Sequence, residues 1–212
     1  MFDRLFGREK APENALPVIR NVTLGRTVML DPLAWRRFGD TLKFPFDRDT
    51  LQIVAQGLVE LTDGSFVHRF YTEDDIMFQA VSTDRAGQDV TDVTLFAPWD
   101  SAYPGSASER APWIRRLSAP VFTAPGLPDY TRFWFGPDAP VQDPVTFWED
   151  IHDDRDGVVD RRIFQKCMLF ARELDEPDAR ELLLAIEQQS EAGEVSFEIM
   201  LGVALELGEF KA

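Results

Sequence analysis

The chain has 212 residues, of which 44% are hydrophobic and 12% aromatic, and its formal net charge is −15. This apolar content excludes an intrinsically disordered chain, and the negative charge repels phosphate backbones and anionic lipids, which argues against nucleic-acid binding. A single cysteine, Cys167, excludes an internal disulfide and a multi-cysteine zinc site, and its apolar neighbours indicate a buried, unreactive thiol.

Residues 1–17 contain Pro12 and Pro17 and are predicted to form a flexible leader before one globular domain over residues 18–212. The start of the chain lacks the apolar core of a signal peptide. Nowhere does the sequence reach the roughly 18 consecutive apolar residues of a membrane span. We therefore expect a cytoplasmic protein with no direct membrane span.

Alternating apolar and polar residues predict antiparallel β-strands along most of the domain. The clearest pattern is a hairpin, in which residues 51–61 and 66–71 flank a polar turn at residues 62–65. Further strands are expected at residues 28–30, 76–81, 93–96, 130–135, 145–151 and 194–203.

Other stretches carry different signals. Residues 31–38 are predicted to form a helical turn, with Asp31 as N-cap and Pro32 at the first helical position. Six prolines between residues 97 and 128 predict an irregular stretch. For two segments the sequence does not decide between helix and strand, although propensity favours helix. These segments are residues 161–174 and 179–189.

These elements predict an α+β fold with a mainly antiparallel β-sheet and a few short helices. If the two open segments are strands, the strand–turn–strand order of residues 66–96 recurs near the C-terminus. Two similar β-meander halves, about residues 18–128 and 129–212, are therefore a further hypothesis.

Residues 152–163 partly match the calcium-binding loop of an EF-hand. With Gly157 at the sixth position, the candidate metal ligands at the third, fifth and ninth positions are Asp154, Asp156 and Asp160. The match fails at both ends, because His152 stands first and Ile163 replaces the glutamate at the twelfth position. An acidic turn without metal is favoured, and a calcium-binding module is an alternative.

The proline-rich stretch carries the other candidate site. Four of its residues are candidates for a recognition surface, the alternative being that its aromatic rings pack against the sheet: Trp99, Asp100, Tyr103 and Trp113. A cleft beside residues 97–113, with His68 as a candidate group, would suit a small-ligand-binding protein or an enzyme. A histidine on a strand more often has a hydrogen-bonded structural role. Hydrolase, phosphate-loop and zinc-protease motifs are absent, so a non-catalytic protein is favoured, without catalytic residues or cofactor.

Five short segments occur in order along the chain: residues 68–72, 95–104, 145–147, 167–173 and 200–203. Together they resemble the YjfK-like family of uncharacterised bacterial cytosolic proteins, over roughly residues 27–205. The resemblance implies a protein of unknown function. Some members are encoded beside a PspA-like membrane-stress protein and small membrane proteins, which implies a link to that machinery.

The charge is unevenly distributed. Residues 1–40 carry seven basic and five acidic side chains, for a net +2, whereas residues 145–212 carry seven basic and seventeen acidic ones, for a net −10. This asymmetry predicts an acidic face that binds a basic or membrane-associated protein partner. A non-catalytic interaction protein is thus the first hypothesis, and a small-ligand-binding protein or enzyme is the alternative.

Overall fold

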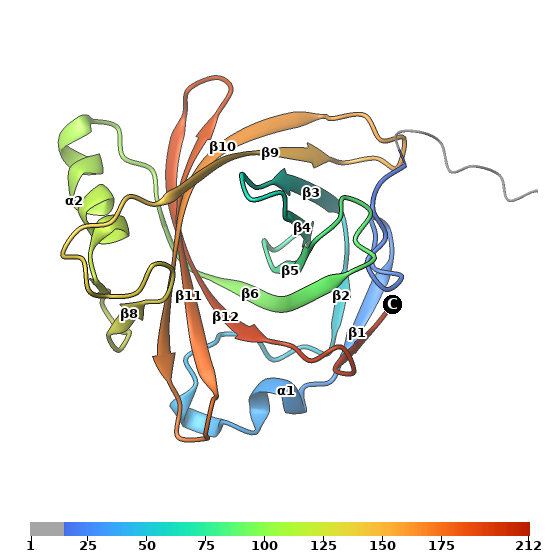
Figure 1. Cartoon of the computed structure of the whole chain (residues 1–212), viewed down its shortest axis with the longest axis horizontal. Coiled ribbons are helices and arrows are strands. Elements are labelled where there is room, and N and C mark those ends of the chain that lie inside the picture. The colour runs from blue at the N-terminus through green and yellow to red at the C-terminus, as the bar shows by residue number, and fades with distance from the viewer. Residues whose placement is uncertain (1–14) are drawn as a thin grey trace, which may run out of the picture.

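The computed structural model describes residues 15–212, and its main feature is a closed eight-stranded antiparallel β-barrel (Figure 1). The barrel strands are β3 (Ala55–Glu60), β4 (Phe66–Tyr71), β5 (Met77–Ser82), β6 (Val90–Ala102), β9 (Val145–His152), β10 (Arg161–Glu173), β11 (Arg180–Ser190) and β12 (Val195–Ala204). Around the ring they follow the order β3, β4, β5, β6, β12, β11, β10 and β9, and β9 closes on β3.

Each half of the chain contributes one four-stranded meander, β3 to β6 and β9 to β12. The meanders join at both edges, because β3 pairs with β9 and β6 pairs with β12. The prediction of a mainly antiparallel sheet with a few short helices is confirmed. The α+β class is corrected to a mostly-β fold, since the sheet closes on itself and the helices only cover its outside.

Smaller elements cover the outer surface of the barrel (Figure 1). They are a three-stranded sheet of β13 (Phe210–Lys211), β1 (Thr27–Leu30) and β2 (Thr50–Gln52), the helices α1 (Leu33–Arg36), η1 (Gly39–Thr41) and α2 (Ala107–Ser118), and the hairpin of β7 (Val121–Phe122) and β8 (Tyr130–Arg132). Aromatic contacts join these elements to the barrel: Phe210 packs on Phe78 with ring centroids 4.9 Å apart. Trp113 of α2 likewise stacks on Phe197 at 5.5 Å. The barrel strands are therefore buried on their outer face as well.

The proline-rich stretch over residues 97–128 is more regular than predicted. β6 continues through Pro98 to its end because this proline lies where the β6–β12 ladder is irregular, at the register shift between Ile199 and Met200. A residue without a backbone N–H is tolerated at such a position.

The stretch also contains α2, whose start is set by a local capping arrangement. The backbone N–H of Glu109 donates to Ser106 Oγ at 3.3 Å, and the Glu109 carboxylate accepts from the backbone N–H of Gly105 at 2.8 Å. The prolines masked this signal in the sequence. The helical turn predicted over residues 31–38 is shorter, because α1 covers only Leu33–Arg36. Its N-cap is Pro32 and not Asp31 as predicted, although Asp31 accepts from the Leu33 N–H at 3.0 Å.

The two segments left open between helix and strand are both strands. β10 and β11 pair without interruption over residues 163–173 and 180–190. Both are apolar on two faces, and burial of both faces in a closed sheet outweighs the helical propensity of their Leu, Glu and Arg residues. By contrast, the strand predicted over residues 130–135 ends at Arg132, and Phe135 adopts a left-handed backbone conformation with a φ of 65°.

The predicted leader over residues 1–17 falls mostly on residues 1–14, which lie outside the described residues. At Pro17 the described chain already contacts the barrel, since its carbonyl accepts from Gln56 Nε2 at 2.8 Å. None of the helices within residues 15–212 is long and apolar enough to cross a membrane.

A buried carboxylate, Glu181 of β11, joins the barrel to its outer layer. It accepts from the Lys43 backbone N–H at 2.6 Å, from the Tyr130 hydroxyl at 2.6 Å and from Arg172 Nε at 2.7 Å. Its side chain is completely buried. One group therefore satisfies donors from three other segments of the chain.

We expect Glu181→Ala to lower the free energy of unfolding by about 3 kcal/mol, because it leaves the Arg172 charge and two donors without their acceptor. Denaturant unfolding measures this loss. Glu173→Ala is the matched control, since Glu173 lies on the facing strand and forms only an exposed ion pair with Arg180. Equal losses in the two variants would contradict the structural role of Glu181.

Candidate functional site

The lumen of the barrel contains a solvent-open cavity of about 1090 Å³. An eight-stranded barrel is just wide enough to be filled by its own side chains or to hold one small ligand. The lining is mainly apolar and aromatic, and it includes Val67, Val81, Phe96, Phe147, Leu169 and Leu184. Ser65, which directly precedes β4, and Val67 and Arg69 of β4 line it at alternate positions, so the cavity descends about 13 Å, at about 3.3 Å per residue.

The cavity opens at the barrel end that carries the turn at residues 62–65, and it extends into a gap in the barrel wall. β3 and β9 form only three residue pairs, the last between Leu58 and Asp150. Beyond this pair, Glu60 and Trp148 on the two separated strands both line the cavity.

Exposed aromatic side chains surround the opening. Phe133, Phe135 and Trp148 all line the cavity, with exposed fractions of 47%, 63% and 50%. Backbone N–H groups of Phe133 and Trp134 donate to the Leu169 carbonyl, which holds this segment at the rim. Large apolar side chains left this exposed around a cavity are typical of a ligand-entry or contact surface.

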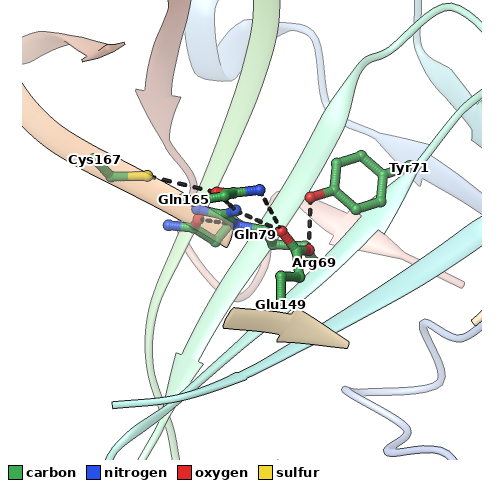
Figure 2. Close-up of polar contacts among 6 residues, drawn as sticks. All are labelled: Arg69, Tyr71, Gln79, Glu149, Gln165 and Cys167. Atoms are coloured by element: carbon green, nitrogen blue, oxygen red, sulfur yellow. Dashed lines mark hydrogen bonds and ion pairs between the residues drawn. The ribbon is translucent and has the colours of Figure 1, made fainter. Parts of the chain in front are cut away.

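A buried ion pair forms the floor of the cavity (Figure 2). Arg69 of β4 donates through Nη1 to Glu149 of β9 at 2.9 Å, and the two residues are 2% and 0% exposed. Gln165 of β10 bridges the pair: its Nε2 donates to Glu149 at 2.7 Å, and its Oε1 accepts from Arg69 at 2.7 Å.

Two further side chains complete this polar floor (Figure 2). The Tyr71 hydroxyl donates to the second oxygen of Glu149 at 2.7 Å, and Arg69 Nε donates to Gln79 Oε1 at 2.9 Å. The Arg69 guanidinium also lies over the Phe147 ring, 5.4 Å from its centroid. Hydrogen bonds to both charged groups are what allow an ion pair to be buried.

The pair spans a whole strand, because β3 lies between β4 and β9. At the crossing point β3 carries Gly57, which pairs with Arg69 on one side and with Ile151 on the other. A Cβ atom on Gly57 would lie 1.8 Å from Glu149 Oε1. The Glu149 carboxylate therefore occupies the space that a side chain at position 57 would need.

Electrostatics keep Arg69 charged. Burial lowers the pKa of Arg69, but the combined effects of Glu149, Tyr71 and Cys167 outweigh burial and raise the pKa above its ordinary value. Burial, followed by the charge of Glu149, raises the pKa of Tyr71 well above its ordinary value. Burial also raises the pKa of the Cys167 thiol to about 12. This thiol is protonated and a poor nucleophile.

Two donors of the floor have no hydrogen-bond partner among the described residues: Arg69 Nη2 and Gln79 Nε2. Both residues line the cavity, so both groups are available to a bound molecule.

The site residues predicted from the sequence do not line the lumen cavity. His68 is buried on the outer face of the barrel, where its Nε2 contacts Ser82 Oγ at 2.8 Å and burial lowers its pKa. It does not line the cavity, which agrees with a structural role. A cavity does lie beside residues 97–113, but His68 lines neither that cavity nor the larger one in the barrel lumen.

The four residues predicted to form a recognition surface differ in exposure. Trp99 and Tyr103 are exposed, by 36% and 76%, and Asp100 is also exposed. Trp113 is half-buried against Phe197. Tyr103 lines a second, smaller cavity of about 490 Å³ at the opposite end of the barrel, together with Arg110.

The candidate metal ligands Asp154, Asp156 and Asp160 are exposed on the turn between β9 and β10. Asp160 accepts from the backbone N–H of Asp153 at 2.7 Å, and Asp156 accepts from that of Val158 at 2.8 Å. Within residues 15–212, no group of three or more His, Cys, Asp or Glu side chains is placed to hold a metal ion.

Sequence reasoning missed the polar floor, although one signal was present. Arg69 shares its strand face with the apolar Val67, and Glu149 shares its face with the apolar Phe147. A charged residue on the buried face of a strand indicates either a buried partner or a functional site. Pairing Arg69 with Glu149, 80 residues away, required the tertiary structure.

Comparison with known proteins identifies the family of the chain. A family model described as "Protein of unknown function (DUF2491)" matches residues 1–211. The chain belongs to this family. It is 28% identical over 135 residues to the uncharacterized protein YjfK of Escherichia coli (strain K12), a match covering 63% of this chain and 59% of that protein. The chain thus spans less than two thirds of that relative's length.

The YjfK-like resemblance predicted from the sequence is therefore confirmed. No solved structure matches the chain. The family description assigns no activity, so the function has to be inferred from the barrel itself.

We expect Gly57→Ala to destabilise the protein by about 1–3 kcal/mol, because the new methyl group displaces the Glu149 carboxylate from its partners. Gly105→Ala is the control, since a Cβ there meets nothing nearer than 3.8 Å and the backbone does not need glycine. Thermal and denaturant unfolding compare the two variants. A neutral Gly57→Ala would show that the carboxylate is not fixed over this glycine.

The lumen also contains Glu198, whose pKa is raised by burial and then by the charge of Asp75, against the opposing effect of Arg69. The folded protein therefore binds this proton more tightly than the unfolded chain, so ionisation of Glu198 costs stability as the pH rises above the ordinary glutamate range. We expect Glu198→Gln to be more stable than the unmodified protein near pH 7. This difference should shrink as the pH falls to about 3, below the ordinary glutamate pKa, where Glu198 is protonated in both states.

Unfolding free energies measured across this pH range test the expectation. Glu194→Gln is the control, because Glu194 lies next to the same strand and is exposed. A pH-independent effect of Glu198→Gln would show that the effect does not arise from ionisation.

Proposed function

We propose that this protein is a non-catalytic binding protein that holds one small, mainly apolar molecule in the barrel lumen. The observation that carries the proposal is the open cavity of about 1090 Å³, lined by apolar and aromatic side chains above a polar floor. Ligand sites are typically concave and mostly apolar, with a few fixed polar groups that orient the ligand.

The energetics support a binding role. A folded barrel with no such role gains free energy by filling its interior, because empty apolar space forfeits dispersion contacts. Here the lower part of the lumen is filled and hydrogen-bonded, while the part nearer the turn at residues 62–65 stays open. A ligand that fills this space restores the missing contacts and buries its own apolar surface.

The chemistry of the lumen favours binding over catalysis. The Cys167 thiol is buried and protonated, and neither histidine is among the residues that line the cavity. The ionised groups of the floor are held in mutual hydrogen bonds, which suits the orientation of a ligand better than proton transfer to it.

The acidic-face hypothesis, with a basic or membrane-associated protein partner, stays a prediction. Two acids near the turn between β9 and β10 are compensated locally: Asp153 pairs with Arg161, and Asp150 pairs with Arg162. This local pairing lowers the charge that the turn presents to a partner.

Titration with the neutral fluorescent probe N-phenyl-1-naphthylamine tests the lumen proposal. We expect saturable binding of one probe per chain, because the cavity is a single apolar site. The variant Val81→Trp places an indole in the cavity, where Val81 lines the wall and is only partly buried. We expect it to weaken probe binding by about tenfold or more, the equivalent of about 1.4 kcal/mol.

Val121→Trp is the matched control, because Val121 is 39% exposed on the outer strand β7 and does not line the cavity. Circular dichroism and thermal unfolding establish that both variants are folded. Probe binding that does not saturate, or that both tryptophan variants leave unchanged, would contradict lumen binding.

A further inference from the structure

The charges around the cavity limit what kind of ligand it accepts. Four arginines of the described chain line it, and each already faces a carboxylate: Arg69 with Glu149, Arg85 with Glu60, Arg162 with Asp150, and Arg180 with Glu173. The remaining acids of the lining are Asp63, Asp92 and Asp178. The cavity therefore has no surplus positive charge.

The floor itself is electrically balanced. Arg69 and Glu149 form a neutral pair, the raised pKa values of Tyr71 and Cys167 keep these two side chains protonated, and the acidic Glu198 is a further ionisable group beside them. An anionic ligand would have to lose its hydration next to the negatively charged Glu149. It would not find a free positive charge there to bind, because Arg69 is already paired. The desolvation cost of a buried carboxylate is large, and only an available positive charge offsets it.

The free groups of the floor are nevertheless hydrogen-bond donors. Arg69 Nη2 and Gln79 Nε2 make no hydrogen bond to another described residue, and both residues line the open cavity, where Gln79 is partly exposed. An apolar ligand that displaces water from these donors leaves them without an acceptor, whereas a carbonyl oxygen accepts two hydrogen bonds without adding charge.

We infer that the lumen ligand is an uncharged amphiphile whose inner end carries a neutral hydrogen-bond acceptor, such as a ketone, ester or amide carbonyl. The acceptor lies against Arg69 and Gln79, and the apolar remainder fills the space up to the aromatic rim formed by Phe133, Phe135 and Trp148. The inference rests on the proposed lumen binding and names the class of molecule that this site takes.

Displacement of N-phenyl-1-naphthylamine by three ligands of similar length tests the inference. The ligands are 2-tridecanone, which carries a neutral acceptor, tridecane, which has none, and dodecanoate, which is anionic at about pH 8. We expect 2-tridecanone to bind about three- to tenfold more tightly than tridecane, the value of one or two hydrogen bonds to a neutral acceptor. The affinity for dodecanoate should be lower than that for 2-tridecanone by a factor of about ten or more.

Two variants test the assigned groups. Gln79→Leu removes one donor without changing the charge, so the advantage of 2-tridecanone over tridecane should decrease. Glu149→Gln leaves Arg69 uncompensated, so preference should move by about tenfold or more towards dodecanoate. Glu187→Gln is the control, because Glu187 is a similarly buried acid that pairs with Lys166 on the outer face of the barrel. It should leave the order of the three ligands unchanged.

The outcomes separate this inference from the proposed function. Dodecanoate binding as tightly as 2-tridecanone to the unmodified protein would overturn the neutral-acceptor inference and leave lumen binding intact. Equal binding of 2-tridecanone and tridecane would also overturn it. Both comparisons use the unmodified protein, so they hold even where Glu149→Gln fails to fold. Absence of saturable probe binding would instead remove the proposed function itself.

Discussion

The buried pair between Arg69 and Glu149 is the interaction on which the interior of this barrel depends. Removing two charges from water costs several kcal/mol for each ion, and hydrogen bonds from neighbouring groups offset much of this cost. Tyr71 and Gln165 supply those hydrogen bonds from two further strands. Because β3 separates the two charged residues, the pair forms only where Gly57 leaves the space empty.

This polar floor divides the lumen into two regions. Towards the turn at residues 62–65 lies the large apolar cavity, whose walls come from both meanders. Towards the opposite end, the smaller cavity is lined by Ile163 and Gln188, which continue the inward faces of β10 and β11. The charged pair thus holds the two halves of the barrel together and gives the larger cavity a base with hydrogen-bond donors. A structural constraint and a binding surface are the same group of atoms.

The outer layer explains why the barrel strands are apolar on two faces. Phe78, Phe170 and Phe197 point outward and are covered by the C-terminal strand, by β7 and by α2. Burial of these outward side chains supplies part of the hydrophobic stabilisation of the barrel. The inner face therefore does not have to be completely packed for the barrel to be stable. A barrel supported in this way retains its fold while part of its lumen remains open. The same arrangement keeps His68 buried away from the cavity, in a structural contact with Ser82.

The sequence by itself determined that the chain folds, that its sheet is mainly antiparallel, and that it resembles the YjfK-like family, because period-two patterns, turn residues and short motifs are local signals. Only the tertiary structure decided that residues 161–189 are strands, since burial on two faces overrides their helical propensity. Closure of the barrel was also beyond the sequence, as it depends on pairing between β3 and β9, which lie far apart in the chain. The binding site followed from that closure: Arg69 and Glu149 lie 80 residues apart in the chain, and only the closed sheet brings them 2.9 Å apart.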